Sequence, residues 1–144
     1  MNRVPLLALA SLLVGCGGFR GAHPTGFAPW TDNGPRSWRA ASPEGLVWHI
    51  RTEPHEPKAD LDFWKRSLRE RLDGAGYHIV DSLAFRMGDQ PAWAFEAGLE
   101  EDAWLVAISP GPDGIVVAEA AGSTDAFQKR RGAILEALTR IQPR

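Results

Sequence analysis

Four extended segments follow one another in the second half of the chain without a helical pattern between them, and this restricts the fold most. Each carries the apolar alternation typical of strands. The breaks between them are short and contain glycine, proline and acidic residues. Because such short connections join antiparallel neighbours, the sequence predicts an antiparallel sheet. The predicted strands are Tyr77–Phe85, Pro91–Leu99, Ala103–Ser109 and Gly114–Ala121.

Two further strands are predicted over residues 37–41 and 46–52. Ser42-Pro43-Glu44-Gly45 joins them, with proline and glycine at the positions that a type I turn favours. Apolar residues at helical spacing predict one helix over 60–72 and a second over 124–141. The order ββ-α-ββββ-α predicts an α+β fold in which an antiparallel sheet of about six strands packs against two helices. This single domain is expected to span residues 37–142.

The first sixteen residues have the pattern of an export signal. Arg3 precedes an uncharged, mostly apolar stretch over residues 4–14, which is shorter than the ~20 residues of a membrane-spanning helix. The sequence Leu13-Val14-Gly15-Cys16 that ends this stretch resembles the lipobox of bacterial lipoproteins. The resemblance implies a signal peptide over residues 1–15, cleavage between Gly15 and Cys16, and diacylglyceryl and palmitate groups on Cys16. The alternative is an ordinary secretory signal that contains a cysteine.

The segment after the lipobox is predicted to be a flexible tether. Residues 17–36 contain five glycines and three prolines and show no period of a helix or a strand. The tether with the lipidated Cys16 would therefore span residues 16–36. Phe19, Phe27 and Trp30 are unusual in a linker. They would either dock on the domain or rest among the lipid headgroups, and the sequence leaves both alternatives open.

The element order and two local features resemble the PsbP/DcrB-like fold. These features are the turn Gly88-Asp89-Gln90-Pro91-Ala92, which leads into a strand, and the final helix containing Phe127. The fold group includes bacterial lipoproteins, a photosystem-associated subunit and a nuclear-transport protein that binds a small GTPase. The resemblance implies binding or assembly roles and transfers no catalytic residue to this chain.

Charge and cysteine usage limit the partners. A net charge of −2 without a basic cluster argues against nucleic acid and against a polybasic membrane patch. Membrane attachment is therefore assigned to the lipid on Cys16, the single cysteine. Gly17 follows this cysteine, and the aspartate associated with inner-membrane retention is absent. By resemblance to lipoproteins of Gram-negative bacteria, this implies a location in the cell envelope, on the outer membrane facing the periplasm.

The residues offer little support for catalysis. His49, Glu53 and His55 are the strongest candidates for a metal site, but Arg51 lies between His49 and Glu53 and their spacing matches no zinc motif. No G-x-S-x-G nucleophile motif occurs. The sequence therefore predicts no catalytic residue, no metal and no cofactor.

The predicted sheet has one face of small residues and one of bulky residues. Trp48, Trp64, Trp93 and Trp104 fall on apolar faces, which indicates core packing. One helix could cover most of the face of small residues. Alternatively, this face could remain open and form a groove for a partner or ligand. That face consists of Ala92, Ala94, Ala107, Ser109, Ala118 and Ala120.

Three functions follow, in order of preference. The first is a non-catalytic interaction or accessory module of an envelope complex, with a protein partner. The alternative is a lipoprotein that binds an apolar or glycan ligand, which would need a pocket of at least about 300 Å³ on the sheet. The third, an enzyme, would need a cluster of titratable groups.

Overall fold

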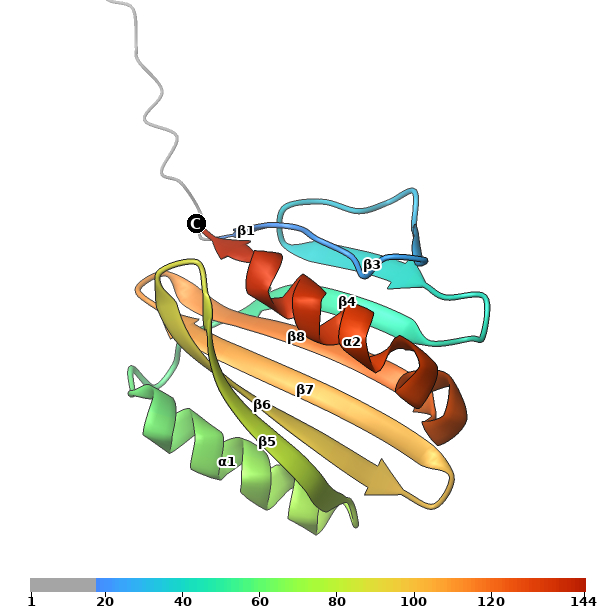
Figure 1. The fold of residues 1–144 in the computed structure, drawn as a ribbon. Helices are drawn as coiled ribbons and strands as arrows, with labels where there is room; N and C mark the ends of the chain where they lie inside the picture. The colour runs from blue at the N-terminus through green and yellow to red at the C-terminus, as the bar shows by residue number, and fades with distance from the viewer. Residues whose placement is uncertain (1–17) are drawn as a thin grey trace, which may run out of the picture.

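The computed structural model describes residues 18–144, which form a twisted antiparallel sheet with one helix on each face (Figure 1). The signal peptide, Gly15 and Cys16 lie outside the described residues. The sheet has seven strands in the order β2-β3-β4-β8-β7-β6-β5, and β1 and β9 form a separate antiparallel pair. The predicted α+β class is confirmed, with more strands than the predicted six. The strands are β1 (Phe19–Arg20), β2 (Ala28–Pro29), β3 (Ser37–Ala41), β4 (Val47–Glu53), β5 (His78–Met87), β6 (Gln90–Leu99), β7 (Asp102–Gly111), β8 (Gly114–Ser123) and β9 (Gln142–Pro143).

Both helices begin at residues that cap them. Helix α1 spans Leu61–Gly74, and the Asp60 carboxylate accepts a hydrogen bond from the N–H of Phe63 at 2.9 Å. Helix α2 spans Thr124–Arg140, and the Ser123 hydroxyl accepts one from the N–H of Ala126 at 3.2 Å. Within the described residues, no helix is long and apolar enough to cross a membrane.

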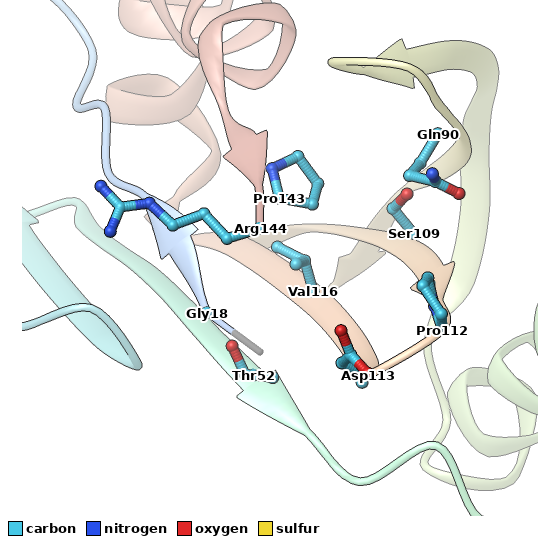
Figure 2. Close-up of a pocket in the computed structure, with 11 residues that line it drawn as sticks. Gly18, Thr52, Gln90, Ser109, Pro112, Asp113, Val116, Pro143 and Arg144 are labelled. Atoms are coloured by element: carbon cyan, nitrogen blue, oxygen red, sulfur yellow. The ribbon is translucent and has the colours of Figure 1, made fainter. Parts of the chain in front are cut away.

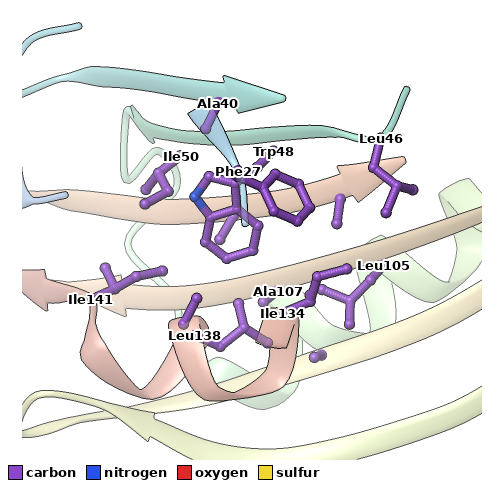
Figure 3. Close-up of a cluster of buried hydrophobic side chains, with 14 of the residues drawn as sticks. Phe27, Ala40, Leu46, Trp48, Ile50, Leu105, Ala107, Ile134, Leu138 and Ile141 are labelled. Carbon is purple, nitrogen blue, oxygen red and sulfur yellow. The ribbon is translucent and has the colours of Figure 1, made fainter. Parts of the chain in front are cut away.

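Helix α2 covers the face of small residues. Five of the six belong to the buried cluster that includes Phe127, Ile134 and Leu138 of α2 (Figure 3). The sixth, Ser109, is also buried and donates a hydrogen bond to the carbonyl of Pro91 at 3.0 Å. The interpretation of this face as a partner or ligand site is therefore corrected, because small side chains let the helix approach closely and leave no groove. All six residues are 2% exposed or less: Ala92, Ala94, Ala107, Ser109, Ala118 and Ala120.

Residues 18–36, predicted as part of a flexible tether, pack on the domain. Strand β1 pairs with β9, and β2 pairs with β3 at the edge of the sheet. Phe19 and Phe27 are buried in the α2-side cluster, where Figure 3 shows Phe27 beside Trp48. The indole N–H of Trp48 donates to the carbonyl of Ala22 at 2.8 Å. The prediction of a flexible tether is therefore corrected for residues 18–36, because aromatic burial and backbone hydrogen bonds fix the segment.

Candidate functional site

A groove lies on the face of the sheet opposite α2. Helix α1 packs on β5, β6 and β7 at one side of this face and leaves the part formed by β8 and β4 without a covering helix (Figure 1). A cavity of about 490 Å³ remains between the helix and these strands, and we name it the α1 groove. Its lining residues are Arg51, Glu53, Pro54, Glu56, Trp64, Ser67, Leu68, Arg71, Trp104, Val106, Ile108, Ile115, Val117 and Glu119.

The floor of the α1 groove is apolar. It consists of β-branched side chains from two neighbouring strands, which alternate with residues that face α2, among them Ala107, Val116 and Ala118. Trp64 and Leu68 of α1 form one wall, and Trp104 lies toward the start of β7. The indole N–H of Trp64 is buried and has no hydrogen-bond partner within residues 18–144. The floor residues are Val106, Ile108, Ile115 and Val117.

The rim opposite α1 is a network of ion pairs centred on Arg51. Its guanidinium contacts Glu119 on the neighbouring strand β8 at 2.7 Å and Glu53 on its own strand at 2.7 Å. Burial opposes the charge of Arg51, but the hydrogen bonds to Glu119 and Glu53 outweigh it and raise the arginine pKa. The network therefore keeps a fixed charged edge beside the apolar floor. Arg71 and Glu56 add exposed charges of both signs to the lining.

The structure separates the three residues considered for a metal site. The His55 ring is held by backbone: Nδ1 lies 2.7 Å from the carbonyl oxygen of Gly111, and Nε2 lies 2.8 Å from the carbonyl oxygen and 3.2 Å from the nitrogen of Ala59. Glu53 is engaged by Arg51, and His49 Nε2 lies 3.0 Å from the hydroxyl of Ser37. Within residues 18–144, no group of three or more histidine, cysteine or acidic side chains could hold a metal ion.

The environment of His49 predicts that the folded protein loses stability as the pH falls into the acid range. Burial, followed by the charges of Arg39 and Arg51, lowers the pKa of His49 from its ordinary value of 6.5. As the pH falls through the unfolded-state value, the unfolded chain therefore binds a proton that the folded protein resists, and the folded state loses stability. We expect His49→Gln to flatten the dependence of the urea unfolding midpoint on pH between about 7 and 5. Parallel curves for the two proteins would contradict this assignment.

A second, smaller pocket lies at the end of the sheet where β1 and β9 pair (Figure 2). Its volume is about 110 Å³, which is below the range for organic ligands. Gly18, Thr52, Asp113 and Arg144 are among its lining residues. This pocket marks the position of Gly18 at the end of the sheet, beside the turn between β7 and β8.

The sequence did not reveal the α1 groove. Its floor residues have the strand parity of a core face, and the small residues of the other face indicated a groove there instead. A usable signal was the shortness of the predicted helix over residues 60–72. In the structure, the 14 residues of α1 span about 21 Å and cannot cover the seven-stranded sheet. A second signal was the position of Arg51 and Glu53 on one strand face. Charged residues on a face that continues into apolar strands indicate that this part of the sheet is not covered.

An antiparallel sheet with one helix on each face and this element order defines a PsbP-like α+β domain. No protein-family model and no curated protein matches the sequence. Among solved structures, the chain is similar to the solution structure of cyanobacterial PsbP (CyanoP) from Synechocystis sp. PCC 6803. The TM-score is 0.52 at 12% identity, covering 96% of this chain and 99% of CyanoP.

The chain is also similar to the crystal structure of the Ran-binding protein Mog1p from Saccharomyces cerevisiae. Here the TM-score is 0.53 at 10% identity, and the match covers 85% of this chain and 84% of Mog1p. At such identities these similarities establish the fold alone. The predicted PsbP-like fold is confirmed by them.

Proposed function

We propose that this protein is a lipid-anchored envelope protein whose domain is a non-catalytic interaction module, and that it binds a protein partner in the α1 groove. The observation that carries the proposal is the apolar floor of the groove beside the fixed charges of Arg51, Glu119 and Glu53. Protein interfaces combine an apolar centre with a polar rim in this way. The similarity to a Ran-binding protein supports a role in protein binding.

The proposal places the protein in the cell envelope. The lipobox resemblance supports cleavage between Gly15 and Cys16 and lipidation of Cys16, and Gly17 supports the outer membrane facing the periplasm. Two or three acyl chains give stable attachment, whereas one chain holds a protein only marginally. The interaction module would therefore act on partners within reach of that membrane.

The volume of the α1 groove supports a second candidate, a small apolar or glycan ligand. About 490 Å³ lies within the range of small-molecule sites. Trp64 and Trp104 offer aromatic surface to such a ligand, and the unpaired indole N–H of Trp64 is a donor that a ligand acceptor could satisfy.

Chemical crosslinking and affinity purification from intact membranes would test the proposed function. Ser67 lines the groove, so Ser67→Trp should block it, whereas Arg69→Trp places the same side chain on an exposed part of α1 outside the lining. We expect the wild-type protein and Arg69→Trp to capture a near-stoichiometric partner. Ser67→Trp should capture at least about tenfold less, equivalent to about 1.4 kcal/mol of binding free energy. Cys16→Ala should be released from the membrane and lose the partner.

Two outcomes would contradict parts of the proposal. Equal capture by Ser67→Trp and Arg69→Trp would exclude the α1 groove as the partner site. If neither the wild-type protein nor Cys16→Ala captures a partner, the interaction role fails. Native mass spectrometry of the purified protein would then test for a bound small molecule, as the second candidate requires.

A further inference from the structure

We propose that the domain rests directly on the membrane in a fixed orientation, with the end of the sheet around Gly18 facing the lipid headgroups. We name this the anchor end and define it by Gly18, Arg20, Arg36, the β7–β8 turn at residues 111–114, and Arg144. The proposal rests on the lipid anchor at Cys16 that is part of the proposed function. It adds which surface of the domain the membrane contacts.

Backbone contacts fix Gly18 to the domain. Its carbonyl accepts a hydrogen bond from the N–H of Arg144 at 2.8 Å, and the N–H of the next residue, Phe19, donates to the carbonyl of Pro35 at 3.1 Å. A Cβ atom on Gly18 would lie 2.8 Å from that same carbonyl oxygen, so the backbone approaches more closely than a side chain would allow. The buried ring of Phe19 adds a side-chain anchor.

The distance between the lipid and this fixed point is therefore short. Cys16 is two residues before Gly18, and two extended residues span at most about 7 Å. A flexible tether over residues 17–36 would have an average span of about 25 Å. The headgroup layer on each side of a bilayer is about 5–7 Å thick. A lipidated Cys16 would thus bring Gly18 to the surface of the headgroups.

The fold gathers positive charge at the anchor end, although the sequence shows no basic cluster and argued against a polybasic membrane patch. Arg20 belongs to β1, Arg36 follows Pro35, and Arg144 binds Gly18, so the same backbone contacts gather three exposed arginines around one point. No ion pair within residues 18–144 involves them. Figure 2 shows the Arg144 side chain extending beside β1, with Asp113 as the acidic side chain at the same pocket. Guanidinium groups bind phosphate oxygens well, so all three arginines favour contact with an anionic membrane surface.

This orientation determines how a partner reaches the α1 groove. Glu53 pairs in register with Ile115 near the anchor end, whereas Trp104 lies near the start of β7, toward the opposite end. The groove therefore runs away from the membrane along the side of the domain. A partner in it would approach parallel to the bilayer.

Fluorescence quenching would test the orientation with the full-length lipidated protein in vesicles of phosphatidylethanolamine and phosphatidylglycerol. Because the chain has a single cysteine, which carries the lipid, Asp113→Cys and Glu101→Cys each introduce one reactive thiol. Both positions are exposed and lie in turns at opposite ends of β7, a strand of ten residues that is about 33 Å long. A headgroup-attached nitroxide quencher should therefore quench a fluorophore at position 113 at least about fivefold more than one at position 101.

Two further variants make the test specific. Ten glycine and serine residues inserted between Gly17 and Gly18 should reduce the difference in quenching. The linker between the lipid and the domain then becomes long enough for the domain to reorient. Replacing Arg20, Arg36 and Arg144 together by glutamate should also reduce it. Equal quenching at the two positions in a membrane-bound protein would overturn the orientation. If the protein with Cys16 intact dissociates from membranes as readily as the Cys16→Ala variant, the lipid anchor itself would be overturned.

Discussion

Phe19→Ala is expected to lower the free energy of unfolding by about 3–5 kcal/mol, the usual range for truncation of a buried phenylalanine. The Phe19 ring is 1% exposed and belongs to the cluster beneath α2. Its removal loses apolar burial and leaves a cavity between β1, the sheet and the helix. Chemical denaturation followed by tryptophan fluorescence would measure the change.

Trp30→Ala provides the matched control. Trp30 belongs to the same N-terminal segment but is 42% exposed, and the guanidinium of Arg39 lies over its ring, 5.3 Å from the centroid. Loss of an exposed cation–π contact costs about 0.5–1 kcal/mol. If Phe19→Ala were as mild as Trp30→Ala, residues 18–36 would not be part of the cooperative domain, and the prediction of a flexible tether would return.

Features governed by local chemistry could be predicted from the sequence. The turn between β3 and β4 follows from Pro43 and Gly45, and Gly88, at a φ of 56°, allows the short connection between β5 and β6. Asp60, the first residue of the predicted helix over 60–72, caps α1. These residues determine the conformation of the few residues around them, so no knowledge of the tertiary structure was needed to place the hairpins and helices.

The N-terminal segment could not be predicted in the same way. Its glycines and prolines lack a strand or helix period, and this composition is also that of a linker. Its order depends on distant partners: β9 for Phe19, and the indole of Trp48 for the carbonyl of Ala22. The sequence left open whether Phe19 and Phe27 dock on the domain, because nothing local distinguishes docking from contact with lipid.

The position of the α1 groove depends on where a helix lies across the sheet. Strand parity separates the face containing Ala107 and Ala118 from the face containing Val106 and Val117, but it does not state how much of either face a helix covers. Helix α2 covers the centre of the small-residue face, whereas α1 lies toward β5 and β6. The α1 groove therefore lies on the face whose bulky residues had indicated a fully packed core.

Ala118→Phe is expected to destabilise the domain by about 3 kcal/mol, at the upper end of the range for an overpacked core. Ala118 is fully buried, and its neighbours in register are Ala107 on β7 and Ile50 on β4. A phenyl ring there has no space beneath α2, so the helix must move away from the sheet or the ring must adopt a strained rotamer. A lower midpoint of thermal unfolding would report this cost.

Ala121→Phe tests whether the cost comes from the face rather than from the added ring. Ala121 lies three residues later on the same strand, on the opposite face, and is exposed. A phenylalanine there should change stability by less than about 0.5 kcal/mol. If Ala118→Phe were equally mild, space would exist between α2 and the small-residue face, and a ligand site on that face would again have to be considered. A large difference between the two variants would instead agree with close packing of α2 on the small-residue face, with the α1 groove on the opposite face of the sheet.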